Sequence, residues 1–299
     1  MKKQTKKFSM ILSLIAIFLF SLLVQDSPAQ PQKSFLWKVQ SKTNTVYVLG
    51  SIHYLRQEMY PLDERIEKAF DQSNILGVEA NVDDVGKMDV QKLVEKALYS
   101  GEETLEKHLS PEAYEIVKKH LSELGASLEA ANKYRPWFLA LTLASIEIAK
   151  LGFDPNFGID RYFLSKATDK RKIVELESLD YQINLFSNLS EKNQELFLLY
   201  TLKDIKVLEQ ELDRLIKAWS SGDEKTVESI VTRSVKQDKR LLPVYEKLII
   251  ERNKKMVSKI EEYLKEKETF FVIVGAGHLV GNQGIIELLK GKGFLIEQL

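Results

Sequence analysis

The sequence predicts an α/β fold, with α+β character, in which a mixed and partly parallel sheet is built from both ends of the chain. Three observations lead to this fold class. Residues 45–79 read in the order strand, turn, helix, strand, which favours a parallel pair of strands. Residues 269–274 form an apolar, β-rich run close to the other end of the chain. Helical spacing dominates the segment between them, so we expect a large helical insertion over about residues 82–265.

The first predicted elements are two short β-rich runs, residues 35–39 and 45–49, which are separated by the turn-like sequence QSKTN. This arrangement predicts a β-hairpin. A further short apolar run, residues 75–78, is closed by Glu79 and predicts another strand. We expect an amphipathic helix between the second and third runs, because four apolar residues recur there at helical spacing: Leu62, Ile66, Ala69 and Phe70.

The middle of the chain carries clear helix signals. Ser110 followed by Pro111 is a good helix start, since serine caps the first turn and proline suits the first helical position. Residues 138–148 are apolar, but they are too few to span a membrane and are expected to form a buried core helix. Residues 171–176 predict a strand, and residues 192–264 predict a run of helices. The chain then ends in a predicted strand, helix and strand, at residues 269–274, 285–289 and 294–299.

A segment of a different kind precedes the predicted hairpin. Residues 1–7, MKKQTKK, are positively charged, and residues 8–24 are apolar apart from serines. Ser27 and Ala29 then satisfy the small-residue rule for signal-peptidase cleavage after Ala29. We therefore expect residues 1–29 to be a signal peptide and the protein to be exported, to the periplasm or outside the cell. The alternative is an uncleaved anchor that attaches the protein to a membrane through residues 8–24, a run at the short limit for crossing a bilayer.

The composition is that of a globular protein and excludes several classes of function. The 43 basic and 43 acidic residues cancel, so the chain lacks the basic excess expected of a nucleic-acid-binding protein. The sequence contains no cysteine, which rules out disulfides, thiolate metal ligands and a cysteine nucleophile. No low-complexity linker divides the chain after the first segment, so residues 30–299 are expected to form a single domain.

Two segments share one plan: an apolar strand, a Gly-x-x-His motif and a helix a few residues further on. They are TVYVLGSIH, with Gly50 and His53, and FFVIVGAGH, with Gly275 and His278. With 14 glycines and 4 histidines in 299 residues, random placement predicts about 0.2 such motifs. Glycine at such a turn serves a positive φ or a close backbone approach. Because ligands of open α/β sheets bind beyond the carboxyl ends of the strands, both histidines are candidates for a site there.

Acidic residues end two other predicted strands. Glu79 is the first acidic residue after the apolar run 75–78, and Glu177 lies at the end of KIVELE. Strands that run parallel end at the same edge of a sheet, so these carboxylates are expected near the two histidines. The strand ends therefore predict a polar cluster made from distant parts of the chain.

Most of the single candidates also have a purely structural interpretation. A lone histidine after a strand is more often a turn residue or a buried hydrogen-bonding group. Glu177 also fits a solvated strand end, Asp160 in FGIDRYF fits a helix cap, and Arg252 in ERNKKM fits a charged helix surface. At the level of sequence, both interpretations stay open for these three. The remaining histidines, His108 and His120, lie in charged helical context and are predicted to be surface residues.

The ordered set of motifs resembles the TraB/PrgY/GumN family, which includes the TIKI metalloproteases. The resemblance rests on the paired Gly-x-x-His motifs and on Glu79, and it covers nearly all of residues 35–299. A single Gly-x-x-His motif is weak evidence, whereas the whole order is specific. Further segments continue the match: FGIDRYF (157–163), LESLDYQINLFSNLS (176–190), ERNKKM (251–256) and VGAGHLVGNQG (274–284).

This resemblance implies a metal-dependent protease, favouring manganese or cobalt, in which His53, His278 and Glu79 are essential. The wider relatives resemble erythromycin-esterase and ChaN-like proteins, whose clefts hold metal-assisted or histidine-based hydrolytic chemistry, or a haem or iron ligand. PrgY-type members are associated with blocking a peptide pheromone. The weaker family positions correspond here to Glu177, Asp160 and Arg252.

The residue types support such chemistry on their own. Two neutral imidazoles and one carboxylate can bind a borderline divalent metal, such as Mn, Co or Zn, and leave positions open for water and substrate. A second carboxylate such as Glu177 could accept a proton, and Arg252 could hold a substrate carboxylate or stabilise an oxyanion. The leading hypothesis is an exported metal-dependent hydrolase that cleaves a peptide or protein substrate. Two alternatives stay open: a non-catalytic protein that sequesters a peptide or a metal-bearing ligand, and a metal-free esterase-like hydrolase.

Overall fold

The computed structural model describes residues 33–83, 89–167 and 170–299. The expected signal peptide or anchor, residues 1–29 with their apolar run, lies outside the described residues. Within the described ranges, none of the helices combines the length and the apolar character that a membrane span requires.

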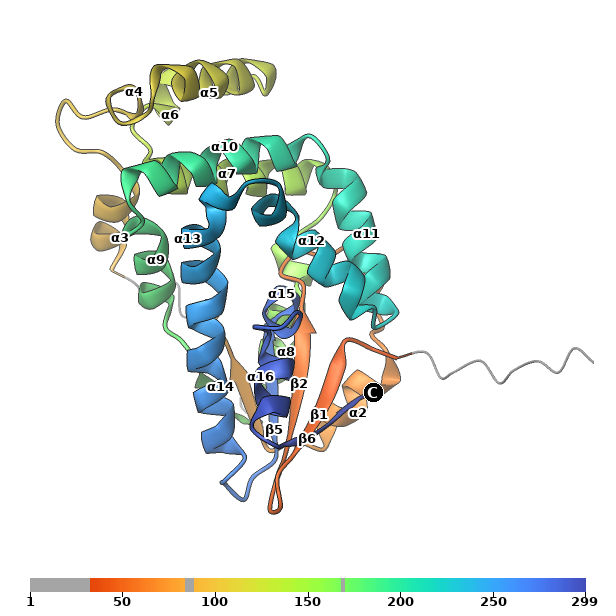
Figure 1. Ribbon diagram of the computed structural model, residues 1–299. Helices are drawn as coiled ribbons and strands as arrows, with labels where there is room; N and C mark the ends of the chain where they lie inside the picture. Colours follow the sequence, from red (N-terminus) through yellow and green to blue (C-terminus); the bar gives the residue numbers. More distant parts are fainter. Residues whose placement is uncertain (1–32, 84–88, 168–169) are drawn as a thin grey trace, which may run out of the picture. The chain divides into compact units, whose positions relative to one another are not determined.

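A six-stranded sheet forms the centre of the described chain (Figure 1). Its strands are β1 (Leu36–Gln40), β2 (Thr45–Ser51), β3 (Ile75–Val78), β4 (Lys172–Glu175), β5 (Phe270–Gly275) and β6 (Leu295–Gln298). They lie in the order β4-β3-β5-β2-β1-β6. The first four of these run parallel, while β1 pairs antiparallel with both of its neighbours. The predicted α/β fold, with a mixed and partly parallel sheet, is confirmed.

The predicted hairpin at the start of the described chain is present. β1 and β2 pair antiparallel, with Gln40 opposite Thr45 next to the turn. Within the turn, the Asn44 side-chain amide donates to the carbonyls of Tyr263 and Glu268, at 2.9 and 2.8 Å. These bonds tie the hairpin to the segment that enters β5, so the two ends of the chain are joined at this edge.

The central pairing joins the two segments that carry the Gly-x-x-His motifs. β2 runs parallel to β5, and in this register Gly50 lies opposite Val274 and Ser51 lies opposite Gly275. Every residue of β5 from Phe270 to Val274 is buried, as expected for a parallel strand that is covered on both faces. The two motifs therefore leave the sheet side by side, although they come from opposite ends of the sequence.

Helices complete one hydrophobic core around the sheet. The predicted amphipathic helix is α2 (Glu64–Asp71), which begins after a cap at Asp63 and buries Ile66 and Phe70. Three later helices add apolar side chains to the same core: α8 (Ile159–Ala167), α14 (Glu251–Tyr263) and α16 (Ile285–Gly291). The core therefore unites residues from the beginning, the middle and the end of the described chain.

Most of the chain between β3 and β5 is helical, and it returns to the sheet at β4. Two further clusters of buried apolar side chains hold these helices together. Its helices include α3 (Val90–Ala97), α4 (Leu105–His108), α5 (Pro111–Glu123), α6 (Leu128–Ala131), α7 (Pro136–Lys150), α9 (Leu179–Ser187), α10 (Glu191–Ile205), α11 (Leu208–Ser220), α12 (Glu224–Gln237) and α13 (Leu242–Tyr245). The expected core helix, residues 138–148, lies in α7, which packs along α10 beyond the carboxyl end of β2 (Figure 1).

Helix α5 confirms one prediction and corrects another. The predicted start is correct, because the Ser110 hydroxyl accepts a hydrogen bond from Ala113 N at 3.3 Å and Pro111 opens the helix. The prediction that His120 is a surface residue is wrong, since it is only 8% exposed. Its charged sequence neighbours point elsewhere, while His120 shares the buried face of the helix with Val117. Burial lowers the pKa of His120 as a result.

Trp219 of α11 offers a test of how the helical segment supports the sheet. Its indole Nε1 donates to the buried carbonyl of Gly50 at 2.6 Å. In Trp219→Phe that carbonyl loses the donor, so we expect the free energy of unfolding to fall by about 1–3 kcal/mol, measured by urea denaturation. Trp137→Phe is the matched control, because that indole makes a longer and partly buried bond of 3.2 Å to Lys96. A loss in the control as large as in Trp219→Phe would contradict the expectation.

Candidate functional site

The parallel strands end at one edge of the sheet, and the predicted site residues lie there. His53 follows β2, Glu79 directly follows β3, and Glu177 follows β4. His278 lies in α15 (Ala276–Leu279), a short helix directly after β5. Backbone pairing continues past two of the strands, because Glu177 N donates to the Glu79 carbonyl at 2.7 Å. The structure thus gathers four strand-end residues from four parts of the sequence.

The glycines of the two motifs are explained by close approach, since neither Gly50 nor Gly275 has a positive φ. A Cβ atom at Gly275 would lie 3.3 Å from Glu79 Oε1 and 3.6 Å from both His53 Nε2 and His278 Cδ2. Three polar side chains therefore converge on one backbone position, and a larger residue would intrude among them. This is the close-approach role that the sequence allowed for these glycines.

His278 is held by an asparagine that the sequence analysis did not single out. Asn253, in α14, donates from Nδ2 to the carbonyl of Gln283 at 2.6 Å. That bond turns the amide oxygen Oδ1 toward His278 Nδ1, also at 2.6 Å. Because the oxygen can only accept, Nδ1 carries the hydrogen and the neutral imidazole presents a lone pair at Nε2. Burial lowers the pKa of His278 to about 4, so the ring is neutral near pH 7.

The lone pair of His278 faces a carboxylate. The distance from His278 Nε2 to Glu79 Oε1 is 3.8 Å, and the same oxygen accepts a hydrogen bond from Gly275 N at 2.5 Å. Both facing atoms are acceptors, and neither brings a hydrogen to the contact. An electropositive group or a water molecule shared by the two atoms would satisfy both of them.

Glu79 stays ionised although it is buried. Burial alone would raise its pKa, but His278, the Arg252 guanidinium, His53 and the Gly275 N–H lower it to about 2. His278 is itself neutral near pH 7, as its own lowered pKa shows. At neutral pH, therefore, the permanently charged guanidinium of Arg252 is the main group that keeps this carboxylate ionised.

Arg252 binds two buried carboxylates at once. Its Nη2 lies 2.6 Å from Glu79 Oε2 and 2.8 Å from Glu177 Oε2, and the three side chains are 11, 9 and 2% exposed. This excludes both a helix-surface role for Arg252 and a solvated position for Glu177. Arg252 lies two residues after the end of a π-helical segment, Glu246–Ile250, and its Nη1 donates to the Leu248 carbonyl at 3.3 Å. Short π-helical insertions of this kind are frequent at functional sites.

His53 forms a pair with Asp160. The distance from Nδ1 to Asp160 Oδ2 is 2.8 Å, and the side chains are 58 and 12% exposed. Asp160, in the first turn of α8, is therefore a partner of a predicted site residue. Its carboxylate raises the pKa of His53 well above the ordinary value, while desolvation acts in the opposite direction. At neutral pH, His53 is a protonated imidazole that is open to solvent.

Three residues beside this cluster were not predicted. One of them is Asn253, the partner of His278 Nδ1. Gln182 donates from Nε2 to Glu79 at 3.3 Å and to Glu177 at 3.2 Å. The Ser51 hydroxyl, at the end of β2, is buried and has no hydrogen-bond partner within the described residues. Asn253 and Gln182 both lie in segments that carry the family resemblance, ERNKKM and LESLDYQINLFSNLS, which is the signal that could have marked them.

The donor set has the chemistry of a site for a borderline divalent metal. Across the described ranges, no three His, Asp, Glu or Cys side chains lie close enough together to form a ready metal site. Two observations nevertheless fit such an ion. His53 and His278 each have Nδ1 held by a side-chain oxygen and, among the described residues, no hydrogen bond at Nε2, an arrangement typical of metal-binding histidines. In addition, His278 and Glu79 face each other through acceptor atoms.

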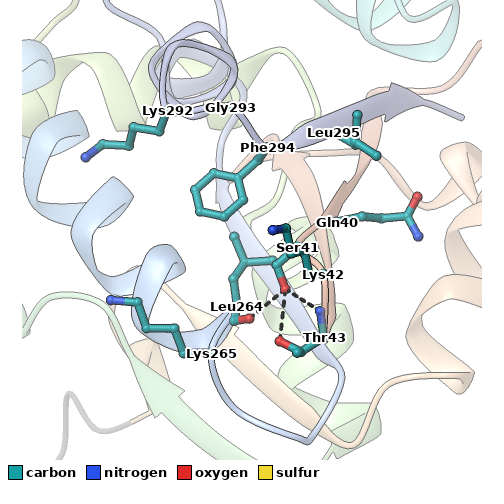
Figure 2. A pocket seen from close by; sticks show the side chains of 10 residues that line it. All are labelled: Gln40, Ser41, Lys42, Thr43, Leu264, Lys265, Lys292, Gly293, Phe294 and Leu295. Carbon is teal, nitrogen blue, oxygen red and sulfur yellow. Dashed lines mark hydrogen bonds between the residues drawn. The ribbon is translucent and has the colours of Figure 1, made fainter.

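A cavity of about 530 Å³ lies near the opposite end of the sheet, beside the turn between β1 and β2 (Figure 2). Its lining includes Phe294 and three lysines, Lys42, Lys265 and Lys292. Figure 2 also shows the Ser41 hydroxyl bonded to Thr43 within the turn and to the carbonyl of Leu264. The predicted site residues are absent from the lining of this cavity, so it is separate from the candidate site.

Fold and site together define a class: an α/β protein with two histidines and two buried carboxylates at the carboxyl edge of parallel strands. The chain belongs to the TraB/PrgY/gumN family, whose family model matches residues 35–298. The family membership that the sequence motifs predicted is thereby confirmed. No solved structure gives a significant match to the chain.

Individual relatives are distant but cover most of the chain. The chain is 26% identical to the uncharacterized protein YbaP of Escherichia coli (strain K12), over 82% of this chain and 87% of that protein. It is 25% identical to the Metalloprotease TIKI homolog of Nematostella vectensis, over 91% of this chain and 68% of the relative. It is 23% identical to Metalloprotease TIKI1 of Xenopus tropicalis, over 87% of this chain and 60% of the relative. Some family relatives are therefore named as metalloproteases.

Removal of Arg252 tests the buried ion-pair cluster. Arg252→Met leaves Glu79 and Glu177 buried without a counter-charge, so we expect the free energy of unfolding at pH 7 to fall by about 3–5 kcal/mol. Arg240→Met is the matched control, since Arg240 also binds a carboxylate, that of Asp238, at 2.6 Å but is 68% exposed. Its loss should change stability little. Urea denaturation measures both variants, and equal losses would show that burial is not the cause.

The lowered pKa of His278 predicts a change of stability with pH. The unfolded imidazole takes up a proton near its ordinary pKa of 6.5, whereas the folded one resists protonation down to about 4. The wild-type protein should therefore lose up to about 3 kcal/mol as the pH falls through this window. In His278→Gln this component should disappear, while His108→Gln, on the helical segment, should retain it. Denaturant titrations between pH 4 and 7 measure the slopes, and an unchanged slope in His278→Gln would refute the prediction.

Proposed function

We propose that the protein is an exported, metal-dependent hydrolase that cleaves peptide bonds. The observation that carries this proposal is the convergence of His53, His278 and Glu79 around Gly275, with both imidazole Nε2 atoms free. The TIKI relatives are named as metalloproteases, which supports the proposal. The substrate would accordingly be a peptide or protein chain.

His53 and His278 would hold the metal through Nε2, with Glu79 as the carboxylate ligand. Manganese, cobalt and zinc all accept such a donor set. A bound ion of this kind lowers the pKa of a water molecule and polarises a carbonyl group. Asp160 and Asn253 orient the two imidazoles by holding Nδ1 of each ring, at 2.8 and 2.6 Å, so that both Nε2 atoms stay directed away from their supports.

Arg252 and Glu177 would act mainly through charge. The Arg252 guanidinium keeps Glu79 ionised and therefore available as a ligand. Its N–H groups already bind Glu79, Glu177 and the carbonyl of Leu248. Stabilising an oxyanion, the role that the sequence suggested, would fall to an N–H group outside these bonds, since a guanidinium carries five donors. Glu177 is the second carboxylate near the reacting groups and a candidate proton acceptor.

Export is part of the proposal. Residues 1–29 would act as a signal peptide, or residues 8–24 would anchor the protein to a membrane. Residues 30–299 would then form one domain, with the helical insertion over about residues 82–265. The support is the charge and hydropathy pattern of the sequence, in which the basic start MKKQTKK precedes an apolar run and a small-residue cleavage position.

A metal-free hydrolase is the second candidate, and the pair of His53 with Asp160 is the observation that favours it. An exposed imidazole bonded to a carboxylate is a suitable acid–base group. Because Asp160 raises the pKa of His53, this imidazole would donate a proton near neutral pH and accept one only in alkaline solution. Activity of this kind should survive a chelator. A sequestering protein, in contrast, would capture a peptide without turnover.

Metal analysis combined with a peptide-library assay tests the proposal. The purified protein, supplied with Mn, Co or Zn, should retain the metal and cleave peptides, and EDTA should reduce cleavage at least about tenfold. His53→Ala and His278→Ala should lose both the metal and the cleavage. His108→Ala is the control, because His108 binds Glu103 and Glu191 on the helical segment, and it should retain both.

Each alternative gives a different result in the same assay. Cleavage that survives EDTA would favour the metal-free hydrolase. Peptide binding without turnover under every metal would favour the sequestering protein. Full activity in either His53→Ala or His278→Ala would overturn the proposed function.

A further inference from the structure

A second cavity, of about 350 Å³, lies between α10, α12, α13 and the π-helical segment that precedes Arg252. Its lining is mostly apolar and includes Phe197, Val235, Val244 and Leu248. Ligand pockets for whole small molecules span roughly 300–1,000 Å³, so this volume is at the small end of that range. It suits one or two side chains better than a cofactor.

Of the polar groups that line this cavity, Tyr200, Asp204 and Ser234 are already paired. Tyr200 donates its hydroxyl to Asp238 at 2.7 Å. Asp204 accepts hydrogen bonds from Arg233 at 2.8 Å and from Ser234 at 3.1 Å. A charged group that entered the cavity would lose its hydration without gaining a free partner of opposite charge. The lining therefore selects for an apolar group.

Two residues that line the cavity, Leu248 and Val231, contact segments of the candidate site. Leu248 lines the cavity, and its carbonyl accepts a hydrogen bond from Arg252 Nη1 at 3.3 Å. Val231 also lines the cavity, and its Cγ2 would lie 3.1 Å from a Cβ atom at Gly277. Gly277 is the residue before His278. The segments that carry Arg252 and His278 therefore adjoin residues that line the cavity.

We infer that this cavity is a specificity site that holds one large apolar side chain, such as leucine or phenylalanine, of a peptide substrate. The inference rests on the proposed function, because it is the nearness of Arg252 and of the His278 segment that makes a substrate the occupant. An extended peptide advances about 3.3 Å per residue, so the inference places this side chain within a few residues of the bond held near His278. An apolar pocket typically separates side chains that differ by one methylene by about 10–200-fold.

Thr201, on α10, lines the cavity and offers a way to fill it. The probes are fluorescent peptides. In each set, one position carries Gly, Ala, Leu or Phe, and all other positions stay the same. Their Kd values are measured in EDTA by fluorescence anisotropy. The wild-type protein should prefer Leu or Phe over Gly at least about tenfold at one position, and Thr201→Phe should reduce this ratio below about threefold. Binding of the Gly peptide should stay unchanged.

Thr43→Phe is the matched control, because it makes the same substitution in the lysine-lined cavity of Figure 2. That variant should keep the wild-type preference. Tyr245→Ala tests the opposite change, since Tyr245 also lines the apolar cavity and its truncation enlarges the space. This variant should move the preference toward tryptophan. Thermal unfolding checks that all three variants fold. If Thr201→Phe does not fold, the preference of Tyr245→Ala alone tests the specificity site.

Failure of this inference can be distinguished from failure of the proposed function, because binding is measured apart from cleavage. A preference that vanishes in Thr201→Phe supports the specificity site, even where no metal restores cleavage and the hydrolase proposal falls. If the wild-type protein cleaves peptides and Thr201→Phe keeps the wild-type binding preference, the specificity site is overturned. The hydrolase proposal then stands. Absence of any preference, or of any peptide binding, in the wild-type protein also overturns the inference.

Discussion

The buried contact of Arg252 with Glu79 and Glu177 is the constraint on which the rest of the site depends. Two buried carboxylates that follow neighbouring parallel strands repel each other, and a cation between them offsets this repulsion. The guanidinium is a planar fork that meets both carboxylates at once. It comes from α14, so this contact fixes the helix, and the π-helical segment before it, to the edge of the sheet.

The same helix also sets the state of a histidine. Asn253 follows Arg252 directly in α14 and orients His278 through Nδ1, while the parallel pairing of β2 with β5 brings the His53 motif alongside. One turn of α14 therefore neutralises two carboxylates and chooses the tautomer of an imidazole. A shift of this helix would disturb the charge and the orientation of the site together, because neighbouring residues of one element control both.

Sequence alone could locate most of the groups, Asp160 and Arg252 among them, but it did not show which of them would pair. The repeated Gly-x-x-His motif marked His53 and His278, and strand ends marked Glu79 and Glu177, because parallel strands must end at a common edge. Helical periodicity shows which face of a helix is apolar, but it does not show which strand end that face will meet. Asn253 was therefore missed. His120 was mispredicted for the same reason, since its charged neighbours indicated exposure and the packing of α5 buried it.

The two histidines differ in charge although their motifs are alike, and the partner of Nδ1 helps explain why. The Asp160 carboxylate favours protonated His53, whereas burial, with a neutral amide at Nδ1, favours neutral His278. A metal ion that binds both rings must displace a proton from His53, so its affinity should increase with pH. Without a metal, the same rings offer one proton donor and one proton acceptor near neutrality. In either chemistry, Asp160 sets the pH at which His53 becomes available.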